Sequence, residues 1–231
     1  PEKFIKTAEL LQITDLERVQ MLTTILENLP YGDPLKHVNN PVLYLNDISS
    51  RISELKREGV NPDRLDHFIH EQALFAERTK ELFESMLSTN AGQYTESLLD
   101  DIHNGLMEMG KSVEGSDYLY RSAGLLLIRA RELAALNPTK TGKVSYSKLK
   151  EEMKRFYTQV SGKIEHQKSL NIVYRQYLKV MEENGRYDFE DMINNVLSLL
   201  VSEENMRRDF QERYQYVLVD EYQDTNTAQN R

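Results

Sequence analysis

The stretch from Ser145 to Asn184 contains no proline, and Gly162 is its only glycine. At 1.5 Å of rise per residue, it predicts one long helix of roughly 60 Å. Lys163 and Gln167 interrupt the coiled-coil-like spacing of its apolar residues, so a pair of shorter helices is an alternative. With only 10 Gly and 6 Pro in 231 residues, the whole chain is predicted to be mainly α.

Apolar residues recur at helical spacing in several other segments. Residues of the types that cap or open helices precede most of these segments, and Thr14 and Glu17 have the spacing of a capping box. The further helices are expected to begin at or near Thr14, Asn40, Asn61, Tyr94, Ser116, Asp188 and Ser202.

One segment breaks the helical pattern. Residues 216–219, Tyr-Val-Leu-Val, form a short apolar run that is typical of a fully buried strand in a parallel sheet. No other segment predicts a strand. Because one strand cannot make a sheet, its partners are expected outside this sequence.

Two acids follow this predicted strand directly. Ligands bind at the carboxyl edge of open α/β sheets, so Asp220 and Glu221 are in the position that a nucleotide hydrolase requires. One acid can hold the magnesium that bridges the β- and γ-phosphates, and the other can activate the attacking water. An acidic turn after a strand is the alternative interpretation of the pair.

The longer string at 217–226, Val-Leu-Val-Asp-Glu-Tyr-Gln-Asp-Thr-Asn, resembles the second helicase motif of the UvrD/Rep family of superfamily one. Residues 174–177, 188–189 and 210–214 are similar to the approach to that motif, in looser form. Residues 11–15 and 55–60 resemble the start of the helical insertion that the family calls 1B. The resemblance thus covers about residues 10–64 and 170–231, and it leaves 65–167 unassigned.

The resemblance implies an ATP-dependent DNA helicase that moves on single-stranded DNA with 3'-to-5' polarity and acts in DNA repair or replication. Residues 1–186 would form the helical insertion, enlarged by 65–167, and 187–231 part of a RecA-like motor domain ending in the Walker B motif. Asp220 would coordinate magnesium and Glu221 would be the catalytic base. Gln223 and Asp224 would couple the ATP site to DNA and to the other motor domain.

A second pattern, at 105–112, matches the phosphate-binding loop G-x-x-x-x-G-K-[ST] literally. The segment before it is acidic and helical in pattern, and Glu108 would face the phosphates, whereas a true loop follows a buried strand. We therefore interpret this match as coincidental, and no phosphate loop is expected in the chain. Such a fragment would be inactive by itself and would bind no ATP or magnesium. The remaining helicase domains would act with it in cis.

The net charge is −8, but residues 140–179 contain ten Lys and Arg against three Glu. This basic segment also contains aromatic residues, a combination that favours contact with the phosphates and bases of DNA. The hypothesis assigns duplex contact to Lys148, Lys154, Arg155 and Lys163. A solvated helix face is the alternative.

The remaining composition restricts other classes of function. The chain has no cysteine, so disulfides, thiolate metal sites and cysteine nucleophiles are excluded. No segment has the length and apolar character of a membrane span, and a cytoplasmic location is expected. A helical DNA- or protein-binding module and part of a helicase-nuclease stay open as alternatives.

Overall fold

The computed structural model describes residues 10–37, 39–89, 104, 146–227 and 229. Within these residues the chain is mainly helical, as predicted, and it divides into two compact units. Unit 1 comprises Pro1–Leu65 and Ser169–Arg231, and unit 2 comprises Asp66–Lys168. The helices predicted near Tyr94 and Ser116 lie outside the described residues. No described helix is both long enough and apolar enough to cross a membrane.

Helix α2 (Asp15–Glu27) begins with the predicted capping box. The Glu17 N–H donates to Thr14 Oγ1 over 3.2 Å, and the Thr14 N–H donates to Glu17 Oε2 over 2.9 Å. After the helix ends, Lys36 Nζ donates to the carbonyls of Glu27 and Leu29, at 2.7 Å each. Both ends of α2 therefore have partners for backbone groups that a helix leaves unpaired.

Helix α3 (Leu45–Arg57) starts later than the Asn40 that the sequence predicted. Residues 41–44 form turns closed by short-range hydrogen bonds such as Leu43 N to Asn40 O at 3.0 Å. At its other end, Gly59 has a φ of +64° and forms a Schellman motif, which favours glycine at this position. The helix after it, α4 (Pro62–Thr89), begins as predicted.

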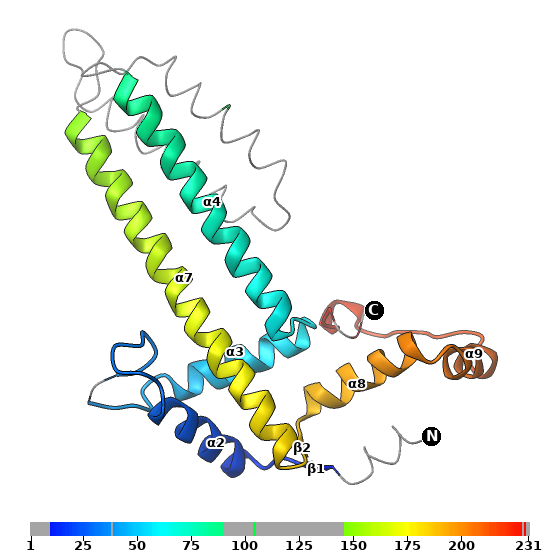
Figure 1. Cartoon of the computed structure of the whole chain (residues 1–231). Helices are drawn as coiled ribbons and strands as arrows, with labels where there is room; N and C mark the ends of the chain where they lie inside the picture. Colours follow the sequence, from blue (N-terminus) through cyan, green and yellow to red (C-terminus); the bar gives the residue numbers. More distant parts are fainter. Residues whose placement is uncertain (1–9, 38, 90–103, 105–145, 228, 230–231) are drawn as a thin grey trace. The chain divides into compact units, whose positions relative to one another are not determined.

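Helix α7 (Tyr146–Glu183) is one uninterrupted helix, which confirms the first of the two sequence alternatives (Figure 1). Gly185, with a φ of +58°, follows its end. Strand β2 (Arg186–Tyr187) then pairs in parallel with β1 (Leu11–Gln12), in the register Leu11 to Arg186 and Gln12 to Tyr187. The sequence did not predict this small sheet.

Helix α8 (Phe189–Ser202) is followed by α9 (Glu204–Arg213) and the short 3-10 helix η1 (Tyr222–Asp224). Asp188 caps α8, as predicted. Ser202 was predicted to cap α9, and this is wrong. It is the last residue of α8, and Glu203 precedes α9 without a side-chain capping hydrogen bond.

The predicted strand at 216–219 is not formed. These residues are extended but unpaired, and Leu218 is 98% exposed. A strand requires neighbours for its N–H and C=O groups, and the described part of the chain provides none here. The sheet that the described residues form lies elsewhere, at β1 and β2.

The core of unit 1 is built mainly from α2, α3 and the second half of α7. Its most deeply buried apolar and aromatic side chains are Leu22, Leu26, Ile48, Ile52, Val173, Tyr174, Tyr177 and Met181. Among the described residues of unit 2, the buried apolar ones are Ile69, Phe75, Val160 and Ile164. Helix α8 departs from this pattern, because its apolar residues Phe189, Met192 and Val196 are all exposed.

Candidate nucleotide-hydrolysis site

The two predicted acids lie in an exposed turn of unit 1, between the extended segment 216–219 and η1. The Glu221 N–H donates to Asp220 Oδ1 over 3.0 Å. Glu221 has a φ of +52° and a ψ of +45°, in the left-handed region that costs an ordinary residue about 1 kcal/mol or more. No other described residue except glycine has a positive φ. The expected strand geometry, with the two acids on opposite faces, is therefore absent here.

The residues after Glu221 form a locally closed turn. The Gln223 side-chain amide donates to Glu221 Oε2, and Thr225 Oγ1 donates to the Tyr222 carbonyl over 2.6 Å. Asn226 and Gln229 each donate a backbone N–H to the other's side-chain oxygen, at 3.1 and 2.9 Å. The turn thus brings Glu221 and Gln223 together. Asp224 lies in η1, and its side chain is outside the described part.

The donor set at Asp220 fits magnesium. Its carboxylate is exposed, and magnesium is usually held by one or two carboxylates together with phosphate oxygens and water. Within the described residues, no group of three or more His, Asp or Glu side chains is arranged to hold a metal ion by itself. A site at Asp220 would therefore need the nucleotide's phosphates as further ligands.

The predicted DNA-contacting residues lie on the part of α7 that belongs to unit 2. Lys154, Arg155 and Lys163 are exposed, and Arg155 forms an ion pair with Glu151 at 2.7 Å. Lys148 lies in α7, but its side chain is outside the described part, as are residues 105–112. Exposure is consistent both with DNA contact and with the solvated-face alternative.

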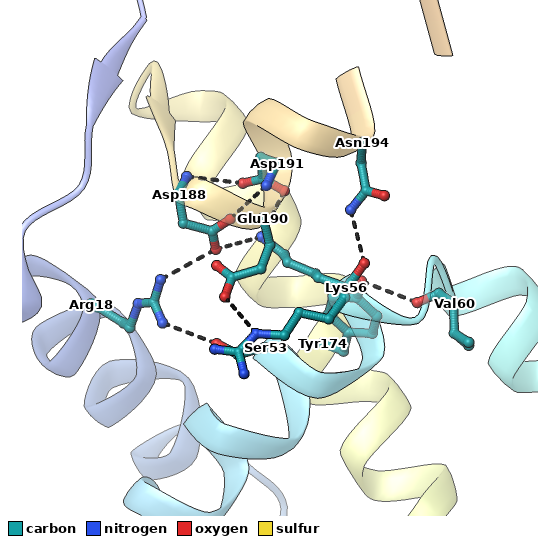
Figure 2. Close-up of polar contacts among 10 residues, drawn as sticks. Arg18, Ser53, Lys56, Val60, Tyr174, Asp188, Glu190, Asp191 and Asn194 are labelled. Atoms are coloured by element: carbon teal, nitrogen blue, oxygen red, sulfur yellow. Dashed lines mark hydrogen bonds and ion pairs between the residues drawn. The ribbon is translucent and has the colours of Figure 1, made fainter. Parts of the chain in front are cut away.

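The most densely connected polar site in unit 1 is one that the sequence analysis missed (Figure 2). We call it the charged cluster, and it joins α2 and α3 to the beginning of α8. Lys56 Nζ is 2.6 Å from Asp188 Oδ2 and 2.7 Å from Asp191 Oδ1, with its side chain only 2% exposed. The members of the cluster are Arg18, Lys56, Arg57, Asp188, Glu190 and Asp191.

Further contacts surround the central interaction of Lys56 with the two aspartates. Arg18 lies 3.4 Å from Asp188 and also donates to Ser53 Oγ over 3.2 Å. Arg57 Nε donates to Glu190 Oε1 over 3.2 Å. The Asn194 side-chain amide donates to the Lys56 carbonyl over 3.0 Å. Helix α3 is therefore bound to the first two turns of α8 through both side chains and backbone.

Local sequence explains why the acids gather at this point. Asp188 and Asp191 form a reciprocal capping box, in which the N–H of each donates to the carboxylate of the other, at 3.1 and 2.9 Å. Acids in the first turn also interact favourably with the positive end of the helix dipole. The cations of α2 and α3 then neutralise the negative charge of the acids at the start of α8.

Burial and neighbouring charges act differently on the two aspartates. Burial raises the pKa of Asp188, but the Lys56 charge and hydrogen bonds from Lys56 and Asp191 outweigh it and hold this pKa below the ordinary value. Burial also raises the pKa of Asp191, and the attraction of Lys56 does not offset burial and the negative charge of Asp188. The neighbouring Tyr174 has its pKa raised, first by burial and then by the same two acids.

Two sequence signals could have pointed to this cluster. Asp188 was expected only as a helix cap, although its spacing to Asp191 is that of a capping box with two acids. Lys56 lies four residues after Ile52, on the stripe that α3 buries. A lysine on an apolar stripe requires a buried anionic partner, but the sequence does not show where that partner is.

Comparisons with known proteins bear on the class of the chain. The model of the UvrD/REP helicase N-terminal domain family matches residues 123–231. ATP-dependent DNA helicases PcrA of Staphylococcus epidermidis and Staphylococcus aureus are each 36% identical to the chain over 64 residues. These residues are 28% of this chain and 9% of each relative. No solved structure matches the chain.

These matches confirm the resemblance of this chain to UvrD/Rep-type helicases. The family match includes the motif at 217–226 and the helices α7, α8 and α9. It begins at residue 123, within the segment that the motifs had left unassigned.

Proposed function

We propose that the chain is part of an ATP-dependent DNA helicase that couples ATP hydrolysis to movement on single-stranded DNA and to duplex unwinding. The observation that carries the proposal is the string at 217–226, which lies within the residues matched by the helicase family model. The relatives' names, ATP-dependent DNA helicase PcrA, support the proposed dependence on ATP and the proposed DNA substrate. The 3'-to-5' direction rests on the family resemblance.

In this proposal the two acids have separate roles. Asp220 would hold magnesium through its exposed carboxylate, and the ion, when bound with ATP, would neutralise charge on the phosphates. The Glu221 carboxylate orients the attacking water and accepts its proton. Gln223, whose side chain contacts Glu221, and Asp224 couple this site to DNA and to the neighbouring motor domain.

The domain layout follows from the same assignment. Residues 1–186 would be the helical insertion, and 187–231 would be part of a RecA-like motor domain. Support comes from the apolar side chains that α8 and the segment 216–219 expose, including Phe189, Met192 and Leu218. A surface of this kind is suited to packing against further sheet strands. The isolated chain would then be inactive, and the remaining helicase domains would complete the site in cis.

The test of this function compares DNA-stimulated ATP hydrolysis by the full-length helicase with that of Glu221→Gln. We expect turnover to fall by about 100-fold or more, since the carboxylate that accepts the proton is lost. Binding of a fluorescent ATP analogue should be retained, because Gln keeps the shape of the side chain. Unchanged turnover would contradict the role of Glu221 and the helicase proposal with it.

Contact between α7 and duplex DNA is the second part of the proposal. Lys154 and Lys163 are exposed, and each phosphate contact should contribute about one unit to the salt dependence of binding. Lys154→Glu with Lys163→Glu should therefore weaken binding to a tailed duplex and flatten its salt dependence. Lys80→Glu, an exposed lysine on α4 paired with Glu84, is the control. Equal affinity of all variants would contradict the DNA contact.

A helical binding module is the second candidate. The observation that favours it is the absence of a formed strand at 216–219, which leaves the motif without its sheet. Such a module would bind its partner with no need for Glu221. Binding of the isolated chain to a protein alone, with no salt-dependent binding to tailed DNA, would support this candidate over the helicase.

A further inference from the structure

The last turn of α3 contacts the chain on both sides of the acidic motif. On the upstream side, Lys56 and Arg57 bind the acids in the first turn of α8. On the downstream side, the carboxylate of Glu58 accepts a hydrogen bond from Thr227 Oγ1. Consecutive residues of one helix end thus reach two segments that flank residues 220–224.

The upstream contact holds the start of α8, from which the chain continues to the acidic motif. Lys56 and Asp188 are both 2% exposed at the side chain, and a buried pair of this kind tolerates little displacement because each charge needs the other. The amide of Asn194 adds a bond to the backbone of α3 one turn further along α8. Helix α8 then contacts α9, which leads into the segment before Asp220.

The downstream contact is made by Thr227, which lies only a few residues after the acidic motif. Thr225, which follows η1, is bonded back to Tyr222, and Asn226 is bonded to Gln229 across Thr227. These local bonds make the segment after Glu221 a closed turn rather than a free tail. Whatever holds Thr227 therefore also restricts the position of Glu221.

The segment between these two contacts has little packing of its own. Tyr216, Val217 and Leu218 are at least 75% exposed. The left-handed backbone at Glu221 also needs surrounding structure to hold it. For these reasons the placement of the motif depends on its flanking contacts, and α3 provides contacts on both sides.

We propose that the C-terminal end of α3, Lys56 and Arg57 together with the C-cap residue Glu58, positions the acidic motif, with Glu58 and Thr227 as positioning residues for Glu221. The inference rests on the proposed function. It adds a path by which the helical insertion, to which α3 belongs, influences ATP hydrolysis without touching the nucleotide. The path consists of side-chain contacts between α3, the start of α8 and the turn after the motif.

The test uses the exposed half of this path, because Glu58 and Thr227 are both exposed and their replacement should leave the fold intact. In the full-length helicase, Glu58→Ala and Thr227→Val should each lower kcat by about 3- to 5-fold, the effect of losing one exposed charged contact. The KM for ATP and the midpoint of thermal unfolding should not change. The double variant should be no slower than either single variant, because both remove the same contact.

Matched variants separate positioning from a general effect of substitution. Glu58→Gln and Thr227→Ser retain a hydrogen-bonding pair and should restore most of kcat. Glu54→Ala removes another exposed acid of α3, one that pairs only locally with Arg51 at 2.7 Å, and should leave kcat unchanged. Unchanged kcat in Glu58→Ala, or additive losses in the double variant, would overturn the proposal.

A readout that is independent of activity separates this inference from the proposed function. Amide hydrogen exchange over residues 214–227 should be faster in Glu58→Ala than in wild type or Glu54→Ala. If the full-length protein has no DNA-stimulated ATP hydrolysis, the proposed function fails, and faster exchange would still support the positioning contact. If exchange is identical in all three proteins, the positioning proposal fails even when ATP hydrolysis is present.

Discussion

The charged cluster and the segment 216–219 reverse the usual distribution of residue types. In the cluster, Lys56 and Asp188 are almost completely buried, whereas in the segment Leu218 is 98% exposed. The difference is the availability of partners. The charges meet opposite charges within unit 1, while the apolar run meets no neighbouring strand among the described residues. Whether a side chain is buried in this molecule therefore depends on whether the chain provides it with a suitable partner. Residue type alone does not determine burial.

The most severe test of this comparison is to remove the central cation of the charged cluster. Lys56→Met leaves Asp188 and Asp191 buried without their shared partner and should lower the free energy of unfolding by about 3 to 5 kcal/mol. Urea denaturation followed by circular dichroism measures this change. Arg51→Met, at an exposed pair on the same helix, should change stability by less than about 0.5 kcal/mol. A Lys56→Met protein as stable as wild type would show that the cluster does not hold α3 to α8.

A smaller effect is expected at the edge of the cluster. The Arg57 side chain is 55% exposed, and its partner Glu190 is 9% exposed. Arg57→Met should therefore cost about 1 kcal/mol, since solvent screens one partner and can reach the other in part. The same urea titration applies. A loss as large as that in Lys56→Met would mean that burial of the cation is irrelevant to the size of the effect.

The opposite pKa shifts of the two aspartates predict that the free energy of unfolding depends on pH. The raised pKa of Asp191 means that the folded state takes up a proton before the unfolded state does, so this group adds stability as pH falls through its folded pKa. The depressed pKa of Asp188 has the reverse effect, which appears only below its ordinary value of 3.8. As pH falls from neutrality towards the ordinary value of 3.8, wild type should therefore gain stability relative to Asp191→Asn.

Urea titrations across this pH range check the prediction for Asp191. Asp209→Asn, which replaces an exposed acid of α9, is the control and should follow the wild-type profile. Parallel profiles for wild type and Asp191→Asn would contradict the assigned direction of the shift.

The smallest effect on stability is expected in the exposed segment. Leu218→Lys should change the free energy of unfolding of this chain by no more than about 0.5 kcal/mol, because Leu218 makes little contact to lose. The same change should reduce self-association, since an unpaired apolar strand is a template for pairing between molecules. Light scattering at increasing protein concentration measures this. A marked loss of stability would show that the segment is packed, and the comparison would fail.

Local sequence signals predicted several helix starts, although not those of α3 and α9, and they did not predict tertiary partners. Thr14 and Asp188 act within a few residues of themselves, so their roles could be predicted from spacing and residue type. The long helix α7 followed from the absence of helix breakers. The predicted strand at 216–219 failed because strand formation depends on a neighbour, which no local pattern shows.

The same distinction applies to the candidate site. The acidic pair at 220–221 could be predicted because its two residues are adjacent in the sequence and directly follow an apolar run. Lys56 and its partners were missed because they are far apart in sequence and meet only through folding. Their recognition required knowing which side of α3 faces the beginning of α8.

The separation of Lys56 and Asp188 by 132 residues has a consequence for the order of folding during synthesis. At typical rates of about 5 to 20 residues per second, Lys56 leaves the ribosome on the order of ten seconds before Asp188 does. During that interval α2 and α3 carry cations that have no acid from α8 to meet. Unit 1 can therefore complete its core only after every residue of unit 2 has been translated.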